Sequence, residues 1–360
     1  MKGPSLTVDL AAVQHNVRSW KRRLGERGLW AVVKSDGYRM GMLPAAKACV
    51  AAGAERLCVI DVGEASALRA GGLQLPIVQI CTTPLSDLGT ALRLGVIVTI
   101  DDIPGARALA RLAAASGVVA KAHVAVDTGS GWSGVVHSGI ERFARSAATL
   151  SGVEWEGAWT HIAGPNSLHQ QLERFESGVE DLRTNGLSVP SLHVASTGPL
   201  LWGVKEGAAR LGVGLYGSTL CANGEDVGLR TAVTLTAPIS MIRTFDEPTP
   251  LGYGGTYVAA PSETIVTLRI GYGDGLPRTL AGAGAALLKG QRCPVVGAIG
   301  MNYTMVSAPQ GVNIRIEDEA VLLGEAPGLM LDEVAANAGI IPHNLLTALG
   351  AGGAVSYVGG

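Results

Sequence analysis

The chain has 360 residues, of which 47% are hydrophobic and 16% charged, so it can bury a sizeable core and is long enough for two domains. Its 28 basic and 30 acidic side chains give a formal charge of -2, which excludes the strongly basic surface typical of proteins that bind nucleic acids or anionic membranes. The N-terminus shows no signal-peptide pattern and no stretch is long enough to span a membrane, so we expect a cytoplasmic protein that acts on a small molecule.

A repeating pattern occupies the chain up to about residue 216: a short apolar strand, a few polar or glycine residues, and an alanine- and leucine-rich segment with helical spacing. Ahead of it, Leu6, Val8 and Leu10 alternate as in a strand, and the segment Leu10–Leu24 has helical spacing. Eight such units favour a closed parallel (β/α)8 barrel of the TIM type over an open sheet. The eight predicted strands are Leu29–Lys34, Arg56–Asp61, Pro76–Ile80, Val96–Ile100, Ala120–Asp127, Glu156–His161, Ser191–Ser196 and Arg210–Tyr216.

From about Thr231 the pattern changes to short strands separated by glycine, proline and asparagine. We therefore predict an α/β fold in two parts, an N-terminal barrel over residues 1–228 and a C-terminal, mostly-β domain over residues 229–360. The first strand, about residues 5–10, is expected to pair with the C-terminal domain. The predicted strands of that domain are Ala232–Thr236, Ile265–Ile270, Ala286–Leu288, Pro294–Ile299, Met305–Ser307, Val312–Ile316 and Ala320–Leu323.

The cysteines are scattered and most have apolar neighbours. No two of them have the short spacing of a zinc site or a disulfide framework. We therefore predict reduced thiols and no metal site. The five cysteines are Cys49, Cys58, Cys81, Cys221 and Cys293.

The apolar run Leu29–Val33 is followed abruptly by Lys34. A lysine at the C-terminal end of a buried strand admits two interpretations: the ammonium group extends to water, or it is partly buried with a lowered pKa and can form a Schiff base. In (β/α)8 barrels the chemistry lies at this end of the strands. Polar residues predicted there are Lys34, Asp61, Asp127, His161, Ser196, Thr197 and the glycines after Arg210.

Several separate motifs occur in a fixed order along the chain. They are Ala31-Val32-Val33-Lys34 with Tyr38, Val126-Asp127-Thr128-Gly129, Thr160-His161, Arg210-Leu211-Gly212 with Leu215-Tyr216-Gly217, Gly252-Tyr253-Gly254, Ile270-Gly271-Tyr272-Gly273-Asp274-Gly275, and Val296-Gly297 with Met301. In this order and spacing they resemble the alanine racemase family, a group of fold-type III pyridoxal-phosphate enzymes. The resemblance covers nearly the whole chain and implies pyridoxal 5'-phosphate as the cofactor.

The resemblance also implies a role for each residue that matches a family motif. Lys34 would hold the cofactor through a Schiff base, which requires a primary amine, and Arg210 would face the pyridine nitrogen. Because an arginine donates and stays charged, the ring nitrogen would remain unprotonated and the cofactor would be a weaker electron sink, which suits racemisation. His161 would pack beside the ring and support Arg210. The other cofactor-binding residues would be Tyr38, Ser196, Thr197, Gly212 and Val213.

Racemisation needs a base on each face of the α-carbon, and Lys34 reaches only one face. In the family the second base is a tyrosine from the β domain of the other subunit, and Tyr272 matches it. The resemblance therefore implies a homodimer with shared active sites. The residues expected to bind substrate are Met301, through its backbone amide, Tyr253 and Trp132.

The chain departs from the family pattern where the substrate carboxylate would bind. Ala125 stands in place of a lysine that is often carbamylated, and Trp132 stands in place of the arginine that pairs with it. Trp132 cannot bind a carboxylate as a cation. Asn302 replaces an aspartate at the substrate entrance, and His343 aligns with an active-site tyrosine.

We therefore predict a dimeric pyridoxal-phosphate-dependent amino-acid racemase whose two bases are Lys34 and Tyr272 of the partner subunit. Because the carboxylate side is altered, another reaction on the same cofactor stays open: aldol cleavage or transfer, or decarboxylation, of a non-standard amino acid. A cofactor-binding protein without catalysis is a further alternative, but such barrels lack the β domain that carries Tyr272. The predicted partners are an amino-acid substrate and a second copy of the chain.

Overall fold

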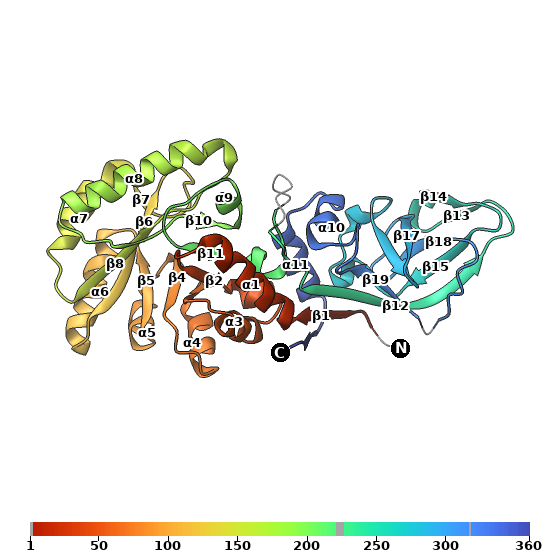
Figure 1. Cartoon of the computed structure of the whole chain (residues 1–360), viewed down its shortest axis with the longest axis horizontal. Coiled ribbons are helices and arrows are strands. Elements are labelled where there is room, and N and C mark those ends of the chain that lie inside the picture. The colour runs from red at the N-terminus through yellow and green to blue at the C-terminus, as the bar shows by residue number, and fades with distance from the viewer. Residues whose placement is uncertain (1–2, 221–226, 317) are drawn as a thin grey trace. The chain divides into compact units, whose positions relative to one another are not determined.

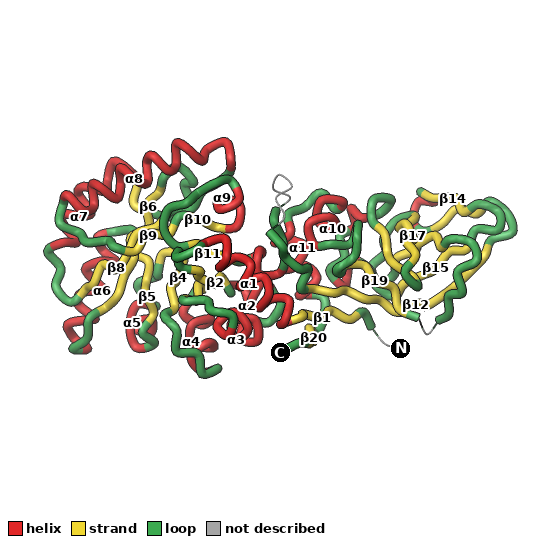
Figure 2. Tube along the Cα trace, viewed as in Figure 1, coloured by secondary structure: helices red, strands yellow, loops and turns green. Residues whose placement is uncertain are grey.

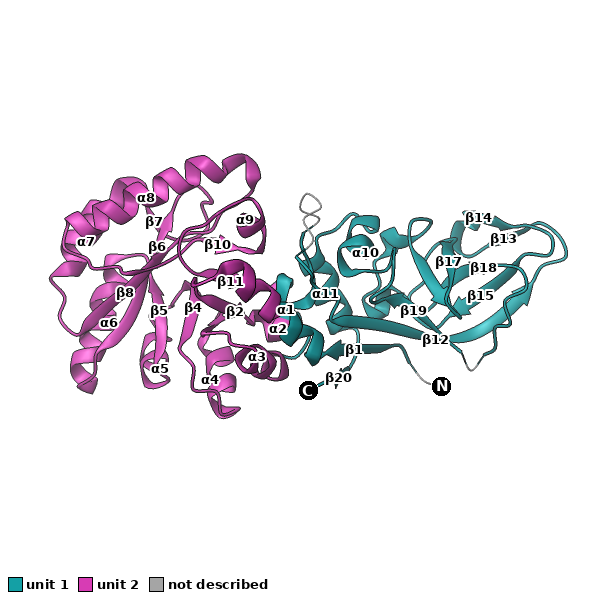
Figure 3. Cartoon of the chain, viewed as in Figure 1, with its two compact units in different colours: residues 1–16, 38–41, 213–360 teal, residues 17–37, 42–212 magenta. Residues whose placement is uncertain are grey.

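The described residues group into two compact units, which Figure 3 colours separately. The computed structural model describes residues 3–220, 227–316 and 318–360. The barrel unit comprises residues 17–37 and 42–212, and the β unit comprises residues 1–16, 38–41 and 213–360. Cys221 lies outside the described residues, and the boundary between residues 228 and 229 stays a prediction.

Parallel strands of the barrel unit form the predicted cylinder (Figure 1). Its strands are β2 (Leu29–Val32), β3 (Arg56–Val59), β4 (Ile77–Thr82), β5 (Val96–Ile100), β6 (Ala120–Asp127), β8 (Val153–Trp159), β9 (Ser191–His193), β10 (Ala195–Ser196) and β11 (Ala209–Leu211), with β7 (Val135–Val136) beside β6. Neighbours pair in parallel from β2 through β9, and β10 pairs with β11, which pairs with β2. Only Val194 separates β9 from β10, so together they act as one strand. Eight strand positions therefore close the described barrel, which confirms the predicted fold.

Helices connect the strands and lie outside them (Figure 2). They are α1 (Leu10–Leu24), α3 (Met42–Ala51), α4 (Val62–Ala70), α5 (Leu88–Arg93), α6 (Ile103–Ser116), α7 (Ile140–Ala148), α8 (Leu168–Thr184) and α9 (Thr197–Leu201), with short 3-10 turns η1 (His137–Gly139) and η2 (Pro165–Ser167). Aspartates cap two of them: Asp61 accepts the N–H of Glu64 at the start of α4, and Asp102 accepts that of Gly105 at the start of α6. Over the described ranges, no helix has the length and apolarity needed to cross a membrane.

The β unit is built around one long strand, β12 (Val233–Thr244). The other strands of its sheet are β1 (Ser5–Asp9), β15 (Thr264–Leu268), β16 (Ala285–Leu288), β17 (Gln291–Val296), β18 (Thr304–Ala308), β19 (Glu319–Leu323) and β20 (Val355–Val358). A separate hairpin is formed by β13 (Thr249–Leu251) and β14 (Tyr257–Ala259). Because β12 pairs with both β19 and β15, six antiparallel strands close on themselves, while β1 and β20 extend the sheet beyond β12. The helices α10 (Leu331–Asn337) and α11 (Pro342–Ala351) complete the unit.

Several predicted strands differ from the structure at their ends, and three predictions differ for a clear physical reason. The strand expected over Arg210–Tyr216 ends at Leu211, and the apolar residues after it form a 3-10 helix, η3 (Val213–Tyr216). The strand expected over Leu29–Lys34 ends at Val32, because the backbone turns left-handed after Lys34. The segment Val312–Ile316 forms no strand and runs as a loop. In the first and third cases an apolar run was mistaken for a strand, which the run alone does not prove.

Gly157 in β8 offers a test of how tightly the barrel closes. A Cβ atom at this position would overlap the carbonyl oxygen of Ser191 on the neighbouring strand and would come within 3.0 Å of Nε2 of His123. We expect Gly157→Ala to lower the free energy of unfolding by about 1–3 kcal/mol, measured by urea denaturation. Gly164→Ala is the matched control, because its extended backbone has nothing within 4 Å of an added Cβ. Equal stability of the two variants would contradict the packing described for β8 and β9.

Candidate active site

Lys34 begins a short left-handed turn, α2 (Lys34–Tyr38), directly after β2. Residues 35–39 all have φ between 53° and 65°. For residues other than glycine this conformation costs roughly 1–2 kcal/mol each, and only Gly37 among the five is a glycine. Strain of this kind persists only where the surrounding structure holds it in place.

Glu64, in the first turn of α4, supplies that restraint. Its Oε1 accepts the backbone N–H groups of Ser35 and of Asp36, the latter at 3.4 Å, and its Oε2 accepts the N–H of Ile60 at 2.9 Å. Burial raises the pKa of the Glu64 carboxyl, while these N–H donors act in the opposite direction. One carboxylate therefore ties the strained turn to the end of β3 and fixes the backbone beside Lys34.

The Lys34 side chain is partly buried. Burial lowers the pKa of its amine, and the positive charge of Arg210 lowers it further, whereas Glu64 and two cysteine thiols act in the opposite direction. A lowered pKa increases the fraction of neutral amine, which is the nucleophilic form. The environment of Lys34 is therefore that of a reactive lysine.

Arg210 lies buried in β11, with 3% of its surface exposed. Its Nη1 donates to Nδ1 of His193 at 2.9 Å and to the carbonyl oxygen of the same residue, and its Nη2 donates to the carbonyl oxygens of Thr160 at 2.8 Å and Val194 at 3.5 Å. These bonds occupy the four N–H groups of the two Nη atoms and leave Nε–H as the fifth donor. Burial lowers the pKa of Arg210 to about 10, so the side chain remains a cation at neutral pH.

Aromatic rings connect Arg210 to the outer end of the barrel. The Trp159 ring lies 5.3 Å from the guanidinium carbon of Arg210. Trp132, which is 52% exposed, lies 6.2 Å from Trp159 and 6.0 Å from the ring of His161, which it meets edge-on. The structure therefore brings three predicted site residues, Arg210, His161 and Trp132, into one cluster.

Asp127 holds the loop that carries Trp132. Its Oδ1 accepts three successive N–H groups, from residues 129–131, at 2.9 to 3.1 Å. Burial opposes the ionised form, but these donors prevail and lower the pKa of Asp127. Ala125 is buried two residues earlier in β6 and offers no charged group. The loop geometry is thus set by Asp127, with no charged group at position 125.

In the β unit, backbone hydrogen bonds bring Tyr272 and Met301 together. The N–H of Tyr272 donates to the carbonyl oxygen of Gly300 at 3.1 Å, and the N–H of Gly273 donates to that of Met301 at 2.8 Å. Tyr272 is 41% exposed and Met301 is 55% exposed. Neither the Tyr272 ring nor the Met301 thioether is therefore buried in the core formed by the described residues. The guanidinium carbon of Arg278 lies 5.5 Å from the Tyr272 ring. Tyr253, also exposed, stacks on another tyrosine ring at 6.2 Å.

The residues expected at the phosphate divide between the two units. Ser196, Thr197 and Gly212 belong to the barrel unit, and Tyr38 and Val213 belong to the β unit. Within the β unit, the buried ring of Tyr38 lies 6.0 Å from the ring of Tyr216 and 5.7 Å from the ring of His343. The structure thus places His343 beside a predicted cofactor-binding residue.

Sequence reasoning missed three polar residues: the partly buried Glu64 and the buried His123 and His193. The prediction from strand positions covered only polar residues at the ends of strands. His123 lies inside β6, and Glu64 lies in a helix. His193 ends β9 but was absorbed into a longer predicted strand. A polar residue within an otherwise apolar run was the available signal, because such residues are buried only when they are hydrogen-bonded.

Sequence profiles and related proteins agree on one family. The profile described as "Alanine racemase, N-terminal domain" matches residues 8–220, and that described as "Alanine racemase, C-terminal domain" matches residues 232–357. An alanine racemase of Syntrophobacter fumaroxidans is 35% identical and covers 95% of this chain and 94% of its own length.

Solved structures point to the same family. The alanine racemase of a D-cycloserine-producing Streptomyces lavendulae superposes with a TM-score of 0.92 at 28% identity, covering 100% of this chain and 98% of that protein. The alanine racemase of Streptomyces coelicolor gives a TM-score of 0.90 at 29% identity, covering 99% and 98% of the two chains. The likeness extends over both units of the fold.

The two buried histidines predict an acid-sensitive fold. Burial lowers the pKa of His123 from 6.5 to about 3 and lowers that of His193 well below 6.5. The unfolded chain therefore binds protons that the folded chain cannot, so stability is lost as the pH falls through 6.5. Between pH 7 and pH 5 we expect the free energy of unfolding to fall by about 2 kcal/mol for each of the two histidines, measured by urea denaturation.

Variants separate this effect from general acid sensitivity. His123→Phe should remove one histidine's share of the pH slope, whereas His169→Phe, at an exposed position of α8, should leave the slope unchanged. Identical slopes for the two variants would contradict the assignment of the slope to the buried imidazoles.

Proposed function

The chain belongs to the alanine racemase family, and we propose that it interconverts the enantiomers of a small amino acid with pyridoxal 5'-phosphate bound at Lys34. The observation that carries the proposal is the pairing of a partly buried, reactive lysine with a buried arginine that keeps one N–H donor uncommitted. The lyase and decarboxylase alternatives receive no support from the relatives, which are alanine racemases.

The residues of the barrel unit fit the cofactor. β11 pairs in parallel with β2, so Arg210 lies on the strand next to the one that leads into Lys34. Lys34 supplies a primary amine with a lowered pKa, and Arg210 supplies a charged Nε–H donor for a ring nitrogen. When bound, pyridoxal phosphate draws electrons from the α-carbon of the substrate and so acidifies its proton. Tyr38, Ser196, Thr197, Gly212 and Val213 are proposed to bind the phosphate, with His161 beside the ring.

Two residues are proposed to move the proton. Lys34, which would hold the cofactor, would also take or return a proton on one face of the α-carbon. Tyr272 is proposed to do the same on the opposite face, from the partner subunit of a homodimer. The exposure of Tyr272, Met301 and Tyr253 supports this proposal, because a residue that serves a neighbouring subunit must lie at the surface of its own. We place the enzyme in the cytoplasm.

The aromatic cluster at the barrel mouth is proposed to set substrate preference. Trp132 lies where the family usually has an arginine and presents an exposed indole ring beside His161. It therefore offers apolar contact to a substrate side chain and no cation to a carboxylate. The backbone amide of Met301 would then carry more of the carboxylate binding. This favours an amino acid with a larger apolar side chain than alanine.

Mixing two inactive variants tests the shared-site dimer. Lys34→Ala should lose the absorbance of the lysine-bound cofactor, whereas Tyr272→Phe should keep it and lose racemisation in both directions, because each direction needs both bases. After unfolding and joint refolding, each mixed dimer holds one site with both residues intact. With random assortment, the mixture should therefore recover about a quarter of the unsubstituted activity.

Two further measurements complete the mixing experiment. Differently tagged chains and co-purification must show that mixed dimers have formed. A mixture in which mixed dimers are present but racemisation stays at the level of the separate variants would contradict shared sites. Normal racemisation by Tyr272→Phe in both directions would contradict the two-base assignment.

Restoring the usual charged pair tests the role of Trp132. We expect the double substitution Ala125→Lys with Trp132→Arg to raise kcat/KM for L-alanine about tenfold, the effect of one charge-assisted hydrogen bond to the substrate carboxylate. Trp132→Leu is the control, because it removes the indole without adding a cation. An unchanged kcat/KM in a folded double variant would show that these two positions do not determine carboxylate binding.

A further inference from the structure

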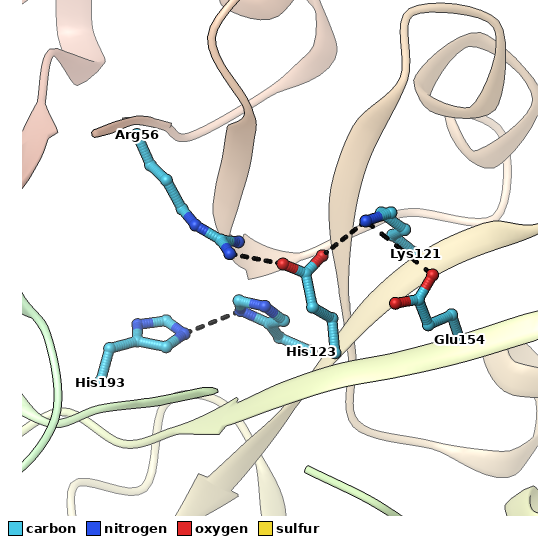
Figure 4. Close-up of polar contacts among 6 residues, drawn as sticks. Arg56, Lys121, His123, Glu154 and His193 are labelled. Carbon is cyan, nitrogen blue, oxygen red and sulfur yellow. Dashed lines mark hydrogen bonds and ion pairs between the residues drawn. The ribbon is translucent and has the colours of Figure 1, made fainter. Parts of the chain in front are cut away.

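Two buried histidines continue the hydrogen-bonded chain that starts at Arg210. His193 and His123 both have none of their surface exposed, and Nε2 of His193 lies 2.8 Å from Nδ1 of His123. Figure 4 shows this bond, with the two rings end to end. Since Nδ1 of His193 lies 2.9 Å from Nη1 of Arg210, both ring nitrogens of His193 are engaged. Neither histidine touches Lys34 or has a role in the proton transfer proposed above.

The chemistry of the three side chains permits one arrangement of protons. A guanidinium only donates, so Nδ1 of His193 must accept, and a neutral His193 must then carry its proton on Nε2. That proton is donated to Nδ1 of His123, so His123 must carry its own proton on Nε2. If His123 carried its proton on Nδ1 instead, His193 would have to turn an N–H toward Arg210. The tautomers of the two rings are therefore coupled.

Nearby positive charges keep both rings neutral. His193 is next to Arg210, and His123 lies in the field of Arg56 and Lys121, which pair with Glu156 (Figure 4). Burial and these charges lower the pKa of both imidazoles, so neither carries a second proton at neutral pH.

Packing also holds the two imidazole rings in place, and their proton order carries an energetic cost. The Trp30 ring lies 4.4 Å from the His193 ring and 5.9 Å from the His123 ring, which prevents either ring from turning freely. Nε2 of His123 is buried and has no hydrogen-bond partner among the described residues. An unsatisfied buried N–H is unfavourable, so the fold retains this proton order against a local penalty.

We propose that His193 and His123 form a tautomer lock for Arg210, in which His193 is a positioning residue and His123 fixes its tautomer. The lock holds Nη1 of Arg210 in place and so keeps the Nε–H donor in a single orientation. This inference rests on the proposed function, because the group that Nε–H would face is the pyridine nitrogen of the cofactor. It extends the active site to His123, which has no direct role in the proposed proton transfer.

Nitrogen NMR of the full-length protein, labelled with 15N in histidine, tests the lock with and without pyridoxal phosphate. In the unsubstituted protein we expect His193 and His123 to show protonated Nε2 and unprotonated Nδ1 from pH 5 to pH 8. His123→Phe keeps a ring of similar size but removes the acceptor, and His123→Asn restores an acceptor oxygen near the position of Nδ1. His169→Phe, on the exposed face of α8, is the control.

The two variants should differ because only His123→Asn offers an acceptor to the Nε2–H group of His193. In His123→Phe we expect a mixture of His193 tautomers and a Kd for pyridoxal phosphate raised about tenfold, the effect of one weakened buried hydrogen bond. His123→Asn should restore both the single tautomer and the Kd. Because a merely structural role of His123 would affect stability but not the nitrogen shifts of His193, the NMR readout separates the two.

Several results would overturn the lock. One is a His193 that carries its proton on Nδ1 in the unsubstituted protein. Another is a folded His123→Phe that keeps a single Nε2–H tautomer at His193 and an unchanged Kd. If His123→Phe does not fold, loss of the Nε2–H tautomer in His123→Asn contradicts the proposal equally. If His123→Phe changes the His193 tautomer but even the unsubstituted protein binds no pyridoxal phosphate, the lock is supported and the proposed function is contradicted.

Discussion

The site depends on the buried guanidinium of Arg210, whose hydrogen-bond acceptors among the described residues are all uncharged. Arg210 donates to three carbonyl oxygens and to one imidazole nitrogen of His193, with no carboxylate among them. A carboxylate would neutralise the charge, whereas carbonyl dipoles satisfy the donors and leave the net charge in place. Burial lowers the pKa of Lys34, and the charge of Arg210 lowers it further. The same guanidinium presents a donor that does not give up its proton. Arg210 therefore contributes both to the nucleophile and to the ring partner.

The barrel provides the rigidity that this arrangement needs. Arg210 lies in β11, and Lys34 follows closely on β2, the parallel strand that pairs with β11, so backbone hydrogen bonds between these strands support both positions. After Lys34 the chain turns left-handed against its own steric preference, and the carboxylate of Glu64 binds the N–H groups that this turn exposes. Trp132 lies on a loop, but Asp127 fixes that loop through three N–H groups. The parts that would meet cofactor and substrate are thus preorganised.

The sequence was sufficient for the fold class and most strands, because apolar runs bounded by glycine and polar residues recur with one period. It was insufficient where an apolar run adopts another conformation, as in η3 and in the loop 312–316. Motifs located Lys34 and Arg210, whose chemistry is local. They did not locate Glu64, His123 or His193, because the roles of these residues arise from contacts between distant strands and helices.

The proposed reaction inverts the configuration at the α-carbon of an amino acid. Proton NMR of the pyridoxal-phosphate-loaded protein in D2O, with a panel of L- and D-amino acids, measures this directly. The account predicts loss of the α-proton signal together with formation of the opposite enantiomer, without any new carbon skeleton. New aldehyde, amine or glycine signals, or exchange of the α-proton without inversion, would contradict racemisation and assign the site to lyase or transfer chemistry.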